Sequence, residues 1–257
     1  EMVIRDWSSD VCSSDLEILI HLRERLTRPF VTFGFSVDAD YRAMEVTMEP
    51  GRSVFSVFRR GQLLGEIILR VPGRHNVANA LAAVAACIEL GVPFEIIADG
   101  LRGFTGVGRR FEYVGEVNGI TVVDDYAHHP TEVEATLRTA KEVYGRRVIV
   151  AFQPHLFSRT REFVGEFAEA LAIADKCLLV DIYPAREKPI EGVTSELIRD
   201  RAAARGIGDF ICIGPRTNVA EAVAKIARPG DLVITMGAGS ITLERKNILD
   251  ALKKQCS

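Results

Sequence analysis

After Arg110 the chain alternates between short apolar runs and amphipathic segments of helical period, and this alternation limits the fold more than any other feature. The apolar runs predict strands at Gly119–Asp124, Arg147–Gln153, Lys176–Tyr183, Phe210–Gly214 and Asp231–Met236. The remaining segments predict helices at Thr131–Tyr144, Arg159–Ala174, Thr194–Arg205, Asn218–Ala227 and near Leu243–Lys253. Continuous apolar strands alternating with such helices are typical of a mostly parallel sheet covered on both faces. We therefore predict an α/β fold for this part of the chain.

The preceding part has a different pattern and predicts a separate domain. Its apolar runs predict strands at Val31–Phe35, Tyr41–Met48, Ser53–Arg59 and Leu63–Val71, with a hairpin turn at Arg60-Gly61. Helices are predicted at Asn76–Leu90 and Phe94–Gly103. The segment from Gly103 to Gly108 contains three glycines in six residues, Gly103, Gly106 and Gly108. It is the best position for a domain hinge. A chain of 257 residues is long enough for two modest domains.

Bulk composition excludes several classes of protein. The net charge of −3 gives no reason to expect nucleic acid or an anionic membrane as a partner, and no apolar run has transmembrane length. Five cysteines are present without CxxC spacing, and Cys87, Cys177 and Cys212 lie inside apolar runs, where a small buried hydrophobe is expected. This usage favours a reducing, cytoplasmic setting over a disulfide framework. Oligomeric state stays open.

The first sixteen residues, Glu1–Leu16, have no apolar period and carry the only tryptophan. Asp6–Leu16 resembles the in-frame translation of a sequencing-library adapter, so we interpret residues 1–16 as a foreign, adapter-derived segment and leave them out of the fold prediction. The alternative is a natural flexible tail. If the segment is foreign, Glu17 is not a natural start and the natural protein extends further upstream.

The run from Val122 to Glu132, VVDDYAHHPTE, places polar side chains directly after a predicted strand and before a predicted helix. Pro130 and the pattern Thr131-x-x-Glu134 predict the start of that helix. In open α/β sheets ligands bind at such strand ends, and the following helix N-terminus favours anions. Polar groups after the next strand, in the run QPHLFSRTR from Gln153 to Arg161, repeat this arrangement.

Each of these polar residues has a functional and a purely structural interpretation. Asp125, and to a lesser degree Asp124, is expected to contact a ribose or a metal-associated group, or else to cap the turn. His128 is expected to orient or deprotonate a substrate amine, because neutral imidazole accepts a proton near pH 7 and no further zinc ligands lie nearby. Arg159 either clamps a carboxylate or is solvated at a helix start, and His155 becomes a candidate wall of the same pocket.

Three further segments suit a nucleotide but are weak signals when taken alone. Asn76 and Asn79 follow Gly73 and can pair with an adenine edge, although Asn76 also suits a helix cap. The run Gly106-Val-Gly-Arg-Arg110 joins glycines to paired arginines, which suits a phosphate. Gly237-Ala-Gly239 follows the last strand and fits a close approach of ligand or, equally well, tight strand-to-helix packing.

Together these motifs resemble those of the Mur ligases. The matching runs, in chain order, are GRHNVANALAA, GVGRRFE, VVDDYAHHPTE, FQPHLFSRTR, DIYPAREKPI and GAGSI. The combination of DDYAHHPTE with QPHxFxRT most resembles the family members that add L-alanine to UDP-N-acetylmuramate. The resemblance covers nearly everything from Glu17 to the C-terminus.

The resemblance implies an ATP-dependent, ADP-forming ligase of peptidoglycan precursor synthesis that works through an acyl phosphate, with Mg²⁺ at the phosphates. It implies that Asn76 and Asn79 contact adenine, with His75 in the same motif, that Asp125 reaches the ribose and that Arg110 reaches the γ-phosphate. It places the alanine site at Tyr126, His128, His129, His155 and Arg159. His128 and Arg110 are the residues expected to take part in catalysis, and no metal ligand is predicted in this chain.

The resemblance also implies a domain division, with residues 17–107 as the remainder of a P-loop-type central ATP-binding domain and residues 108–257 as a Rossmann-like C-terminal domain. Two features depart from the family. Leu156 stands where members often carry a basic residue, and no GxxxxGK[ST] phosphate loop occurs in this chain. We therefore expect no ligase turnover from this chain alone. The alternatives are a stand-alone nucleotide- or amino-acid-binding module and a related muropeptide ligase.

Overall fold

A computed structural model describes residues 3–5 and 30–254, and the chain divides into two compact units, Glu1–Gly106 and Val107–Ser257. The division falls inside the glycine-rich segment from which the sequence predicts a hinge. Most of the proposed foreign segment, residues 1–2 and 6–16, lies outside the described residues. Val3–Arg5, which the sequence analysis leaves out of the fold, forms strand β1.

The first unit is a mixed sheet in the order β1-β2-β3-β4-β5 with helices on one face. After β1 its strands are β2 (Phe30–Gly34), β3 (Tyr41–Glu49), β4 (Arg52–Arg59) and β5 (Gln62–Leu69). β1, β2 and β3 pair in parallel, whereas β3, β4 and β5 pair antiparallel. The predicted turn at Arg60-Gly61 is confirmed, because both residues have positive φ and join β4 to β5.

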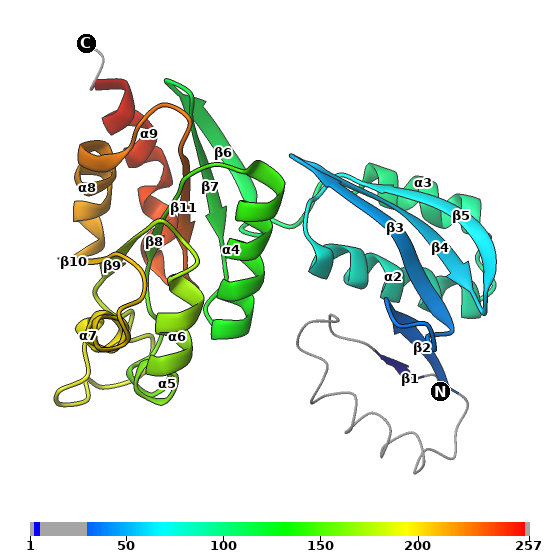
Figure 1. Cartoon of the computed structure of the whole chain (residues 1–257), viewed down its shortest axis with the longest axis horizontal. Helices are drawn as coiled ribbons and strands as arrows, with labels where there is room; N and C mark the ends of the chain where they lie inside the picture. Colours follow the sequence, from blue (N-terminus) through cyan, green and yellow to red (C-terminus); the bar gives the residue numbers. More distant parts are fainter. Residues whose placement is uncertain (1–2, 6–29, 255–257) are drawn as a thin grey trace. The chain divides into compact units, whose positions relative to one another are not determined.

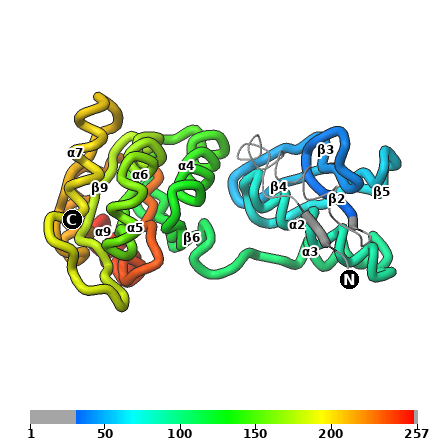
Figure 2. Tube along the Cα trace, turned by 90° about the horizontal axis from the view of Figure 1, so that it is seen from below, coloured from blue at the N-terminus to red at the C-terminus, as the bar shows by residue number. Residues whose placement is uncertain are grey.

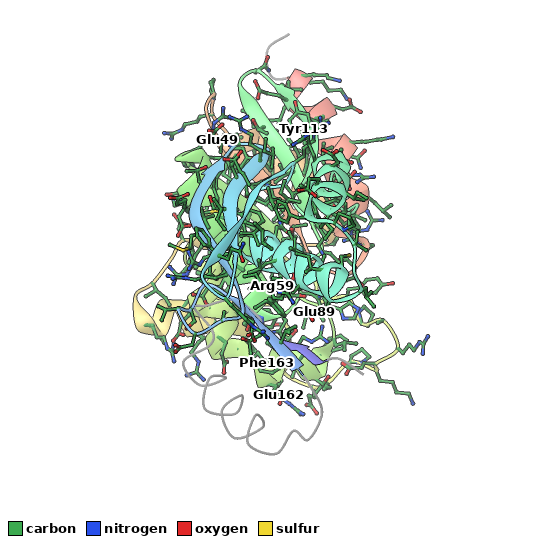
Figure 3. All side chains as sticks on the ribbon, turned by 90° about the vertical axis from the view of Figure 1, so that its right-hand side faces the viewer. Glu49, Arg59, Glu89, Tyr113, Glu162 and Phe163 are labelled. Carbon is green, nitrogen blue, oxygen red and sulfur yellow. The ribbon has the colours of Figure 1, made fainter. Side chains whose placement is uncertain are left out.

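Helices α2 (Arg74–Glu89) and α3 (Phe94–Gly103) bury the apolar face of this sheet (Figure 2). At β5 a Cβ on Gly65 would lie 2.6 Å from the Phe94 ring, so glycine allows α3 to pack closely. At the end of α2, Glu89 accepts from the Tyr41 hydroxyl at 2.6 Å and pairs with Arg59 at 2.7 Å, the latter pair labelled in Figure 3. Burial and the bond to Glu89 raise the pKa of Tyr41, so its hydroxyl stays a donor.

The second unit contains a sheet in the order β10-β9-β8-β11-β7-β6. Its strands are β6 (Glu112–Val117), β7 (Ile120–Asp125), β8 (Val148–Phe152), β9 (Lys176–Val180), β10 (Phe210–Gly214) and β11 (Leu232–Met236). All neighbours pair in parallel except β6, which pairs antiparallel with β7. The predicted mostly parallel α/β sheet is therefore confirmed, and β6 is a strand that the sequence analysis missed.

Helices cover both faces of this sheet because its central strands are apolar on both sides. The helices are α4 (Pro130–Tyr144), α5 (Phe157–Glu162), α6 (Val164–Leu171), α7 (Glu196–Arg205), α8 (Val219–Ile226) and α9 (Glu244–Lys254). One core joins α4, α6 and α7 to the sheet, and a second core on the opposite face joins α8 and α9 (Figure 1). Burying each large apolar side chain in such a core stabilises the fold by roughly 1.5–3 kcal/mol.

Two local predictions for helices are wrong. The single helix predicted over Arg159–Ala174 is two helices, because Phe163 leaves helical geometry (φ −108°, ψ 26°) and packs its ring 5.0 Å from that of His129. The predicted cap at Thr131 and Glu134 lies two residues earlier, at His129 and Glu132. Pro130 occupies the first helical position, so α4 begins earlier in the chain than predicted.

No helix within the described ranges is long and apolar enough to cross a membrane. Cys87, Cys177 and Cys212 are free thiols. Cys177 is buried as expected, and burial raises the pKa of its thiol, whereas Cys87 and Cys212 are only partly buried.

Candidate functional site

The predicted site residues of the second unit gather at the carboxyl edge of its sheet. β7, β11, β8 and β9 run in the same direction, so the segments that follow them emerge at one edge. The chain passes from β7 and β8 to helices on one face, and from β11 to α9 on the other. Adjacent strands that lead to opposite faces open a crevice between their ends, where ligands of open α/β sheets bind.

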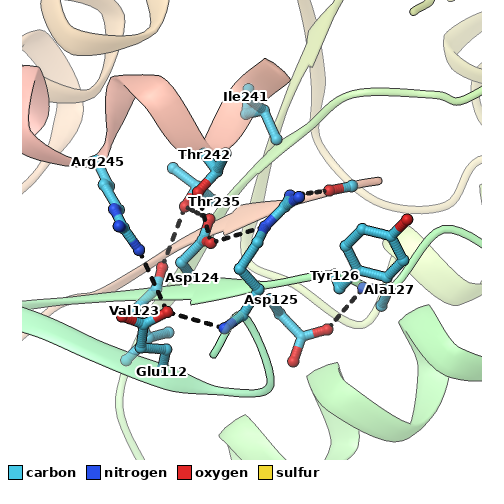
Figure 4. Close-up of polar contacts among 12 residues, drawn as sticks. Glu112, Val123, Asp124, Asp125, Tyr126, Ala127, Thr235, Ile241, Thr242 and Arg245 are labelled. Carbon is cyan, nitrogen blue, oxygen red and sulfur yellow. Dashed lines mark hydrogen bonds and ion pairs between the residues drawn. The ribbon is translucent and has the colours of Figure 1, made fainter. Parts of the chain in front are cut away.

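Asp124 is fully buried and holds several strand ends together (Figure 4). Its carboxylate accepts from the Thr235 hydroxyl at 2.5 Å, the Thr242 hydroxyl at 2.8 Å and Arg109 Nε at 3.2 Å. These donors come from β11, from the turn after it and from the turn before β6. The geometry gives Asp124 a structural role.

Asp125 points to the other side of β7 and is 4% exposed. It accepts from the amides of Phe111 and Ala127, both at 2.8 Å, and from the Thr136 hydroxyl at 3.3 Å. Burial raises the pKa of Asp125 to about 6, against the lowering effect of those bonds and of the Arg110 charge. A carboxylate offers about four acceptor positions, so one remains for a ribose hydroxyl, and that contact stays a prediction.

The paired arginines have different environments. Arg109 is 23% exposed and is bound to Asp124 and to the Gly237 carbonyl, with its guanidinium 4.8 Å from the centre of the Tyr126 ring. Arg110 is 49% exposed; among the described residues it approaches Glu132, at 3.7 Å, and its guanidinium lies 5.7 Å from the centre of the same ring. Arg110 is therefore the arginine that is available to a phosphate.

His128 lies between the Tyr126 ring and the segment that follows β8. Its Nδ1 is 3.0 Å from the Tyr126 carbonyl oxygen and 3.2 Å from Glu132 Oε2. Its ring centre is 5.1 Å from that of Tyr126 and 5.9 Å from that of His155. The structure thus brings together His128 and His155, which the sequence places after different strands.

His129 has a capping role at the start of α4. Its Nδ1 accepts from the Thr131 amide at 3.4 Å, and Glu132 accepts from the backbone amides of His128 and His129 at 3.1 and 3.3 Å. This reciprocal pair is a capping box with histidine in place of serine or threonine. The prediction that His129 also binds substrate stays a prediction.

His155 and Arg159 carry buried polar atoms without partners in the described part of the chain. These atoms are His155 Nδ1 and Arg159 Nη1. Burial and the positive charge of Arg159 lower the pKa of His155, which favours the neutral form of this imidazole. Since buried polar groups are normally hydrogen-bonded, a guanidinium left open beside a neutral imidazole fits an anionic ligand.

Two residues after β9 support this pair. The Tyr183 ring stacks on His155 at 5.7 Å, and the chain segments of the two residues are bridged by the bond from the Leu156 amide to the Tyr183 carbonyl. Glu187 accepts from the Ser158 amide at 3.0 Å and from its hydroxyl, which anchors the start of α5. Leu156, which stands where family members often carry a basic residue, caps α5 with φ 73°, an uncommon conformation for a side-chain-bearing residue.

Gly237 and Gly239 serve packing. A Cβ on Gly237 would lie 2.6 Å from the Gln153 carbonyl oxygen, and one on Gly239 would lie 2.7 Å from Tyr183 Cβ. Gln153 Oε1 also accepts from the Ile241 amide at 2.9 Å. The loop after β11 is therefore fitted against the segments after β8 and β9, as the packing interpretation expects.

The nucleotide residues predicted in the first unit lie at the start of α2. The Asn76 amide donates to the Pro72 carbonyl at 2.7 Å, and the cap position is Gly73, so the expected alternative of Asn76 as a helix cap is wrong. The Asn76 side-chain oxygen remains an acceptor, Asn79 is exposed and His75 is half-buried. Contact of these residues with adenine stays a prediction.

Sequence reasoning missed several residues that hold this site: Arg109, Glu132, Gln153, Tyr183, Glu187, Thr235 and Thr242. Glu132 had a readable signal, because His129-x-x-Glu132 with proline between them fits a capping box. The others become visible only when the strand order is known. In the described ranges no group of three or more His, Cys, Asp or Glu side chains lies together as a metal site.

Two family profiles match the chain, one for each unit. The profile described as "Mur ligase middle domain" matches residues 8–87, and that described as "Mur ligase, glutamate ligase domain" matches residues 109–239. Among curated proteins, a UDP-N-acetylmuramate–L-alanine ligase of Geotalea uraniireducens is 48% identical over 224 residues, which cover 87% of this chain and 49% of the relative. The corresponding ligase of Geobacter sulfurreducens is 47% identical, with 90% of this chain and 50% of the relative covered.

Among solved structures, UDP-N-acetylmuramate-alanine ligase MurC of Thermotoga maritima superposes with a TM-score of 0.74 at 28% identity, covering 88% of this chain and 48% of that one. The chain thus spans about half the length of the curated relatives it matches. One profile alone accounts for more than half of the chain, and a second profile of the same family matches the other unit. The chain therefore belongs to the Mur ligase family.

Proposed function

We propose that this chain is part of a cytoplasmic, ATP-dependent ligase that joins L-alanine to UDP-N-acetylmuramate through an acyl phosphate. The relatives that match at 47–48% identity carry that name. Because the chain spans about half of their length, the activity, the substrates and the cofactors of the whole protein are part of the proposal.

The observation that carries the proposal is the pair of unpartnered buried atoms, His155 Nδ1 and Arg159 Nη1. In this proposal Arg159 binds the carboxylate of L-alanine, since a planar guanidinium pairs with a carboxylate through parallel hydrogen bonds. The neutral His155, stacked on Tyr183, forms the wall of the amino-acid site. His128, whose ring centre is 5.9 Å from that of His155, faces the amine.

The groups on the nucleotide side fit the same proposal. Arg110 is the exposed member of its pair and is free to stabilise charge at the γ-phosphate. Asn79 and the open oxygen of Asn76 suit an adenine edge, and the remaining acceptor position of Asp125 suits a ribose hydroxyl. ATP, when bound, activates the muramate carboxyl by phosphorylation. The described residues form no cluster that fits Mg²⁺, so no step is assigned to the metal.

Binding of L-alanine to this chain tests the proposal directly. In an NMR titration of the ¹⁵N-labelled chain, L-alanine is expected to shift the signals of Tyr126, His128, His155 and Arg159. The variant Arg159→Ala is expected to remove this response, whereas Arg161→Ala, an exposed arginine in the same helix, is expected to keep it. A response to L-alanine that survives Arg159→Ala would contradict the assignment.

A chimera tests the reaction. Residues 30–257 replace the matching part of the Geobacter sulfurreducens ligase, and phosphate release is measured with ATP, UDP-N-acetylmuramate and L-alanine. Arg159→Ala is expected to raise the KM for L-alanine at least tenfold, because a charge-assisted bidentate pair is lost. Phosphate release with a muropeptide instead of L-alanine would identify a related muropeptide ligase, and binding of ligands without release would identify a binding module.

A further inference from the structure

The imidazole of His128 offers its two nitrogens to different surroundings. Nδ1 faces two acceptors, the Tyr126 carbonyl oxygen at 3.0 Å and Glu132 Oε2 at 3.2 Å. Nε2 makes no hydrogen bond to any residue in the described ranges. The hydrogen bond at one ring nitrogen decides where the proton of a neutral imidazole resides. Two acceptors at Nδ1 place that hydrogen on Nδ1 and leave the lone pair on Nε2.

Glu132 is held in place independently of the His128 ring. Its carboxylate accepts from the backbone amides of His128 and His129 at the start of α4 and lies 3.7 Å from Arg110. The carboxylate is 35% exposed, and the ring of His128 is 23% exposed, so water screens the charge only in part. Glu132 therefore presents a fixed negative charge to Nδ1.

We propose that Glu132 is a positioning residue that holds His128 in the Nδ1–H tautomer, so that Nε2 is the atom that accepts the proton from the amine of the incoming amino acid. This inference rests on the proposed function, because that function supplies the amine. It adds to that function a named acceptor atom and a residue outside the predicted site.

The step balances without another reactant. One proton of the substrate ammonium passes to the lone pair of His128 Nε2, and the amine lone pair then attacks the carbonyl carbon of the acyl phosphate. The C–N bond forms, the bond from carbon to the phosphate oxygen breaks, and phosphate leaves with the second amine proton. The imidazolium formed on His128 faces Glu132 from α4 on one side and the neutral His155 on the other. The Glu132 charge stabilises it in the same way as a carboxylate behind a catalytic histidine.

The tautomer can be measured on the chain as it exists. Long-range ¹H–¹⁵N NMR spectra distinguish a ring nitrogen that carries hydrogen from one with a lone pair, and the His128 signals are assigned by their absence in His128→Asn. We expect Nδ1 to carry the hydrogen in the wild-type chain. Glu132→Gln removes the charge but keeps an oxygen for the capping box, and is expected to shift the tautomer ratio about fivefold toward Nε2–H.

Glu134→Gln is the matched control, because Glu134 lies on the same helix and pairs with Arg138 at 2.8 Å. It is expected to leave the tautomer ratio unchanged. A wild-type spectrum in which Nε2 carries the hydrogen would overturn the inference, as would a Glu132→Gln shift no larger than that of the control.

Kinetics in the chimera separate this inference from the proposed function. Glu132→Gln is expected to lower kcat about tenfold and to leave the KM for L-alanine within about twofold, since the acceptor is affected and binding is not. If Arg159→Ala fails to raise that KM, the proposed amino-acid site is wrong. If Arg159→Ala raises KM but Glu132→Gln leaves kcat unchanged, only the role of Glu132 is wrong.

Discussion

Replacing each of the two adjacent arginines with alanine should destabilise this unit to very different degrees. Arg109→Ala removes the cation from the fully buried Asp124 carboxylate and a hydrogen bond from the Gly237 carbonyl. Breaking one partner of a buried pair costs about 3–5 kcal/mol. Because the Thr235 and Thr242 hydroxyls still donate to Asp124, we expect the lower end, about 3 kcal/mol.

Arg110→Ala is the control for that prediction. Arg110 is half exposed, and its approach to Glu132 at 3.7 Å is a surface ion pair, so its loss is expected to cost less than about 1 kcal/mol. In the active chimera, however, Arg110→Ala is expected to lower kcat at least tenfold if this residue stabilises the transferring phosphoryl group. We thus expect Arg109 to be needed for stability and Arg110 to be needed for activity.

Native-state hydrogen exchange of the β7 and β11 amides measures the free energy of opening of this unit separately from the first unit. Arg109→Ala is expected to lower that free energy by about 3 kcal/mol, which multiplies the exchange rates of these amides by about one hundred or more. Equal destabilisation by Arg109→Ala and Arg110→Ala would refute the structural role given to Arg109. So would an Arg109→Ala chain with wild-type protection.

Two other predictions follow from single positions in this unit. Burial raises the pKa of Asp125 from 3.8 to about 6, so the folded state binds the proton more tightly than the unfolded state does. The contribution of Asp125 to stability is therefore full below pH about 4 and falls by about 3 kcal/mol by pH about 6. Urea titrations across this pH range should show that loss, and Asp125→Asn should abolish the pH dependence. Gly239→Ala places a Cβ 2.7 Å from Tyr183 Cβ and should destabilise by about 1–3 kcal/mol in calorimetric unfolding, whereas Gly165→Ala, in a helix with its nearest neighbour at 3.8 Å, should stabilise by about 0.5–1 kcal/mol.

The alternation of apolar runs and amphipathic helices predicted most of the second unit because its central strands are buried on both faces. β8 and β11 are buried along their whole length, which leaves an uninterrupted apolar signal in the sequence. β6 lacks that signal. It is an edge strand with a glycine at position 115 and an exposed Tyr113, and it is defined by its pairing with β7. A strand of this kind is recognised only through its neighbour.

The sequence pattern does not predict the order of the strands in the sheet. β11 is the last strand in the chain and lies between β7 and β8, which the sequence shows as consecutive. This insertion carries Thr235 to Asp124 and Gly237 to Arg109, over separations that no local motif covers. The sequence therefore identified the two motifs of the site but not the residues that connect them.

Adjacent identical residues explain why the sequence did not separate structural from functional side chains. His129 is extended (φ −112°, ψ 144°), so its side chain and that of His128 point to different sides, whereas Arg109 lies in a turn with φ 61°, which separates its side chain from that of Arg110. Arg109 binds inside and Arg110 is exposed; His129 caps α4 and His128 keeps a free Nε2. Sequence motifs give the chemistry of such a pair but not the division of roles.

The division of roles also fixes the electrostatic character of the site. The carboxylates nearest the strand ends, Asp124, Asp125 and Glu132, are occupied by hydroxyls, backbone amides and arginine within the unit. The groups left open are Arg110 and Arg159, which are cations, and the lone pair of His128. In the proposed function, an edge with satisfied anions and open cations attracts the carboxylate of an amino acid and a phosphoryl group, and His128 Nε2 and the unpartnered His155 Nδ1 are the imidazole nitrogens left open beside them. In the proposed function the substrate amine supplies the proton that His128 Nε2 accepts, since a carboxylate bound at Arg159 would bring the amine of the same amino acid to this edge of the sheet.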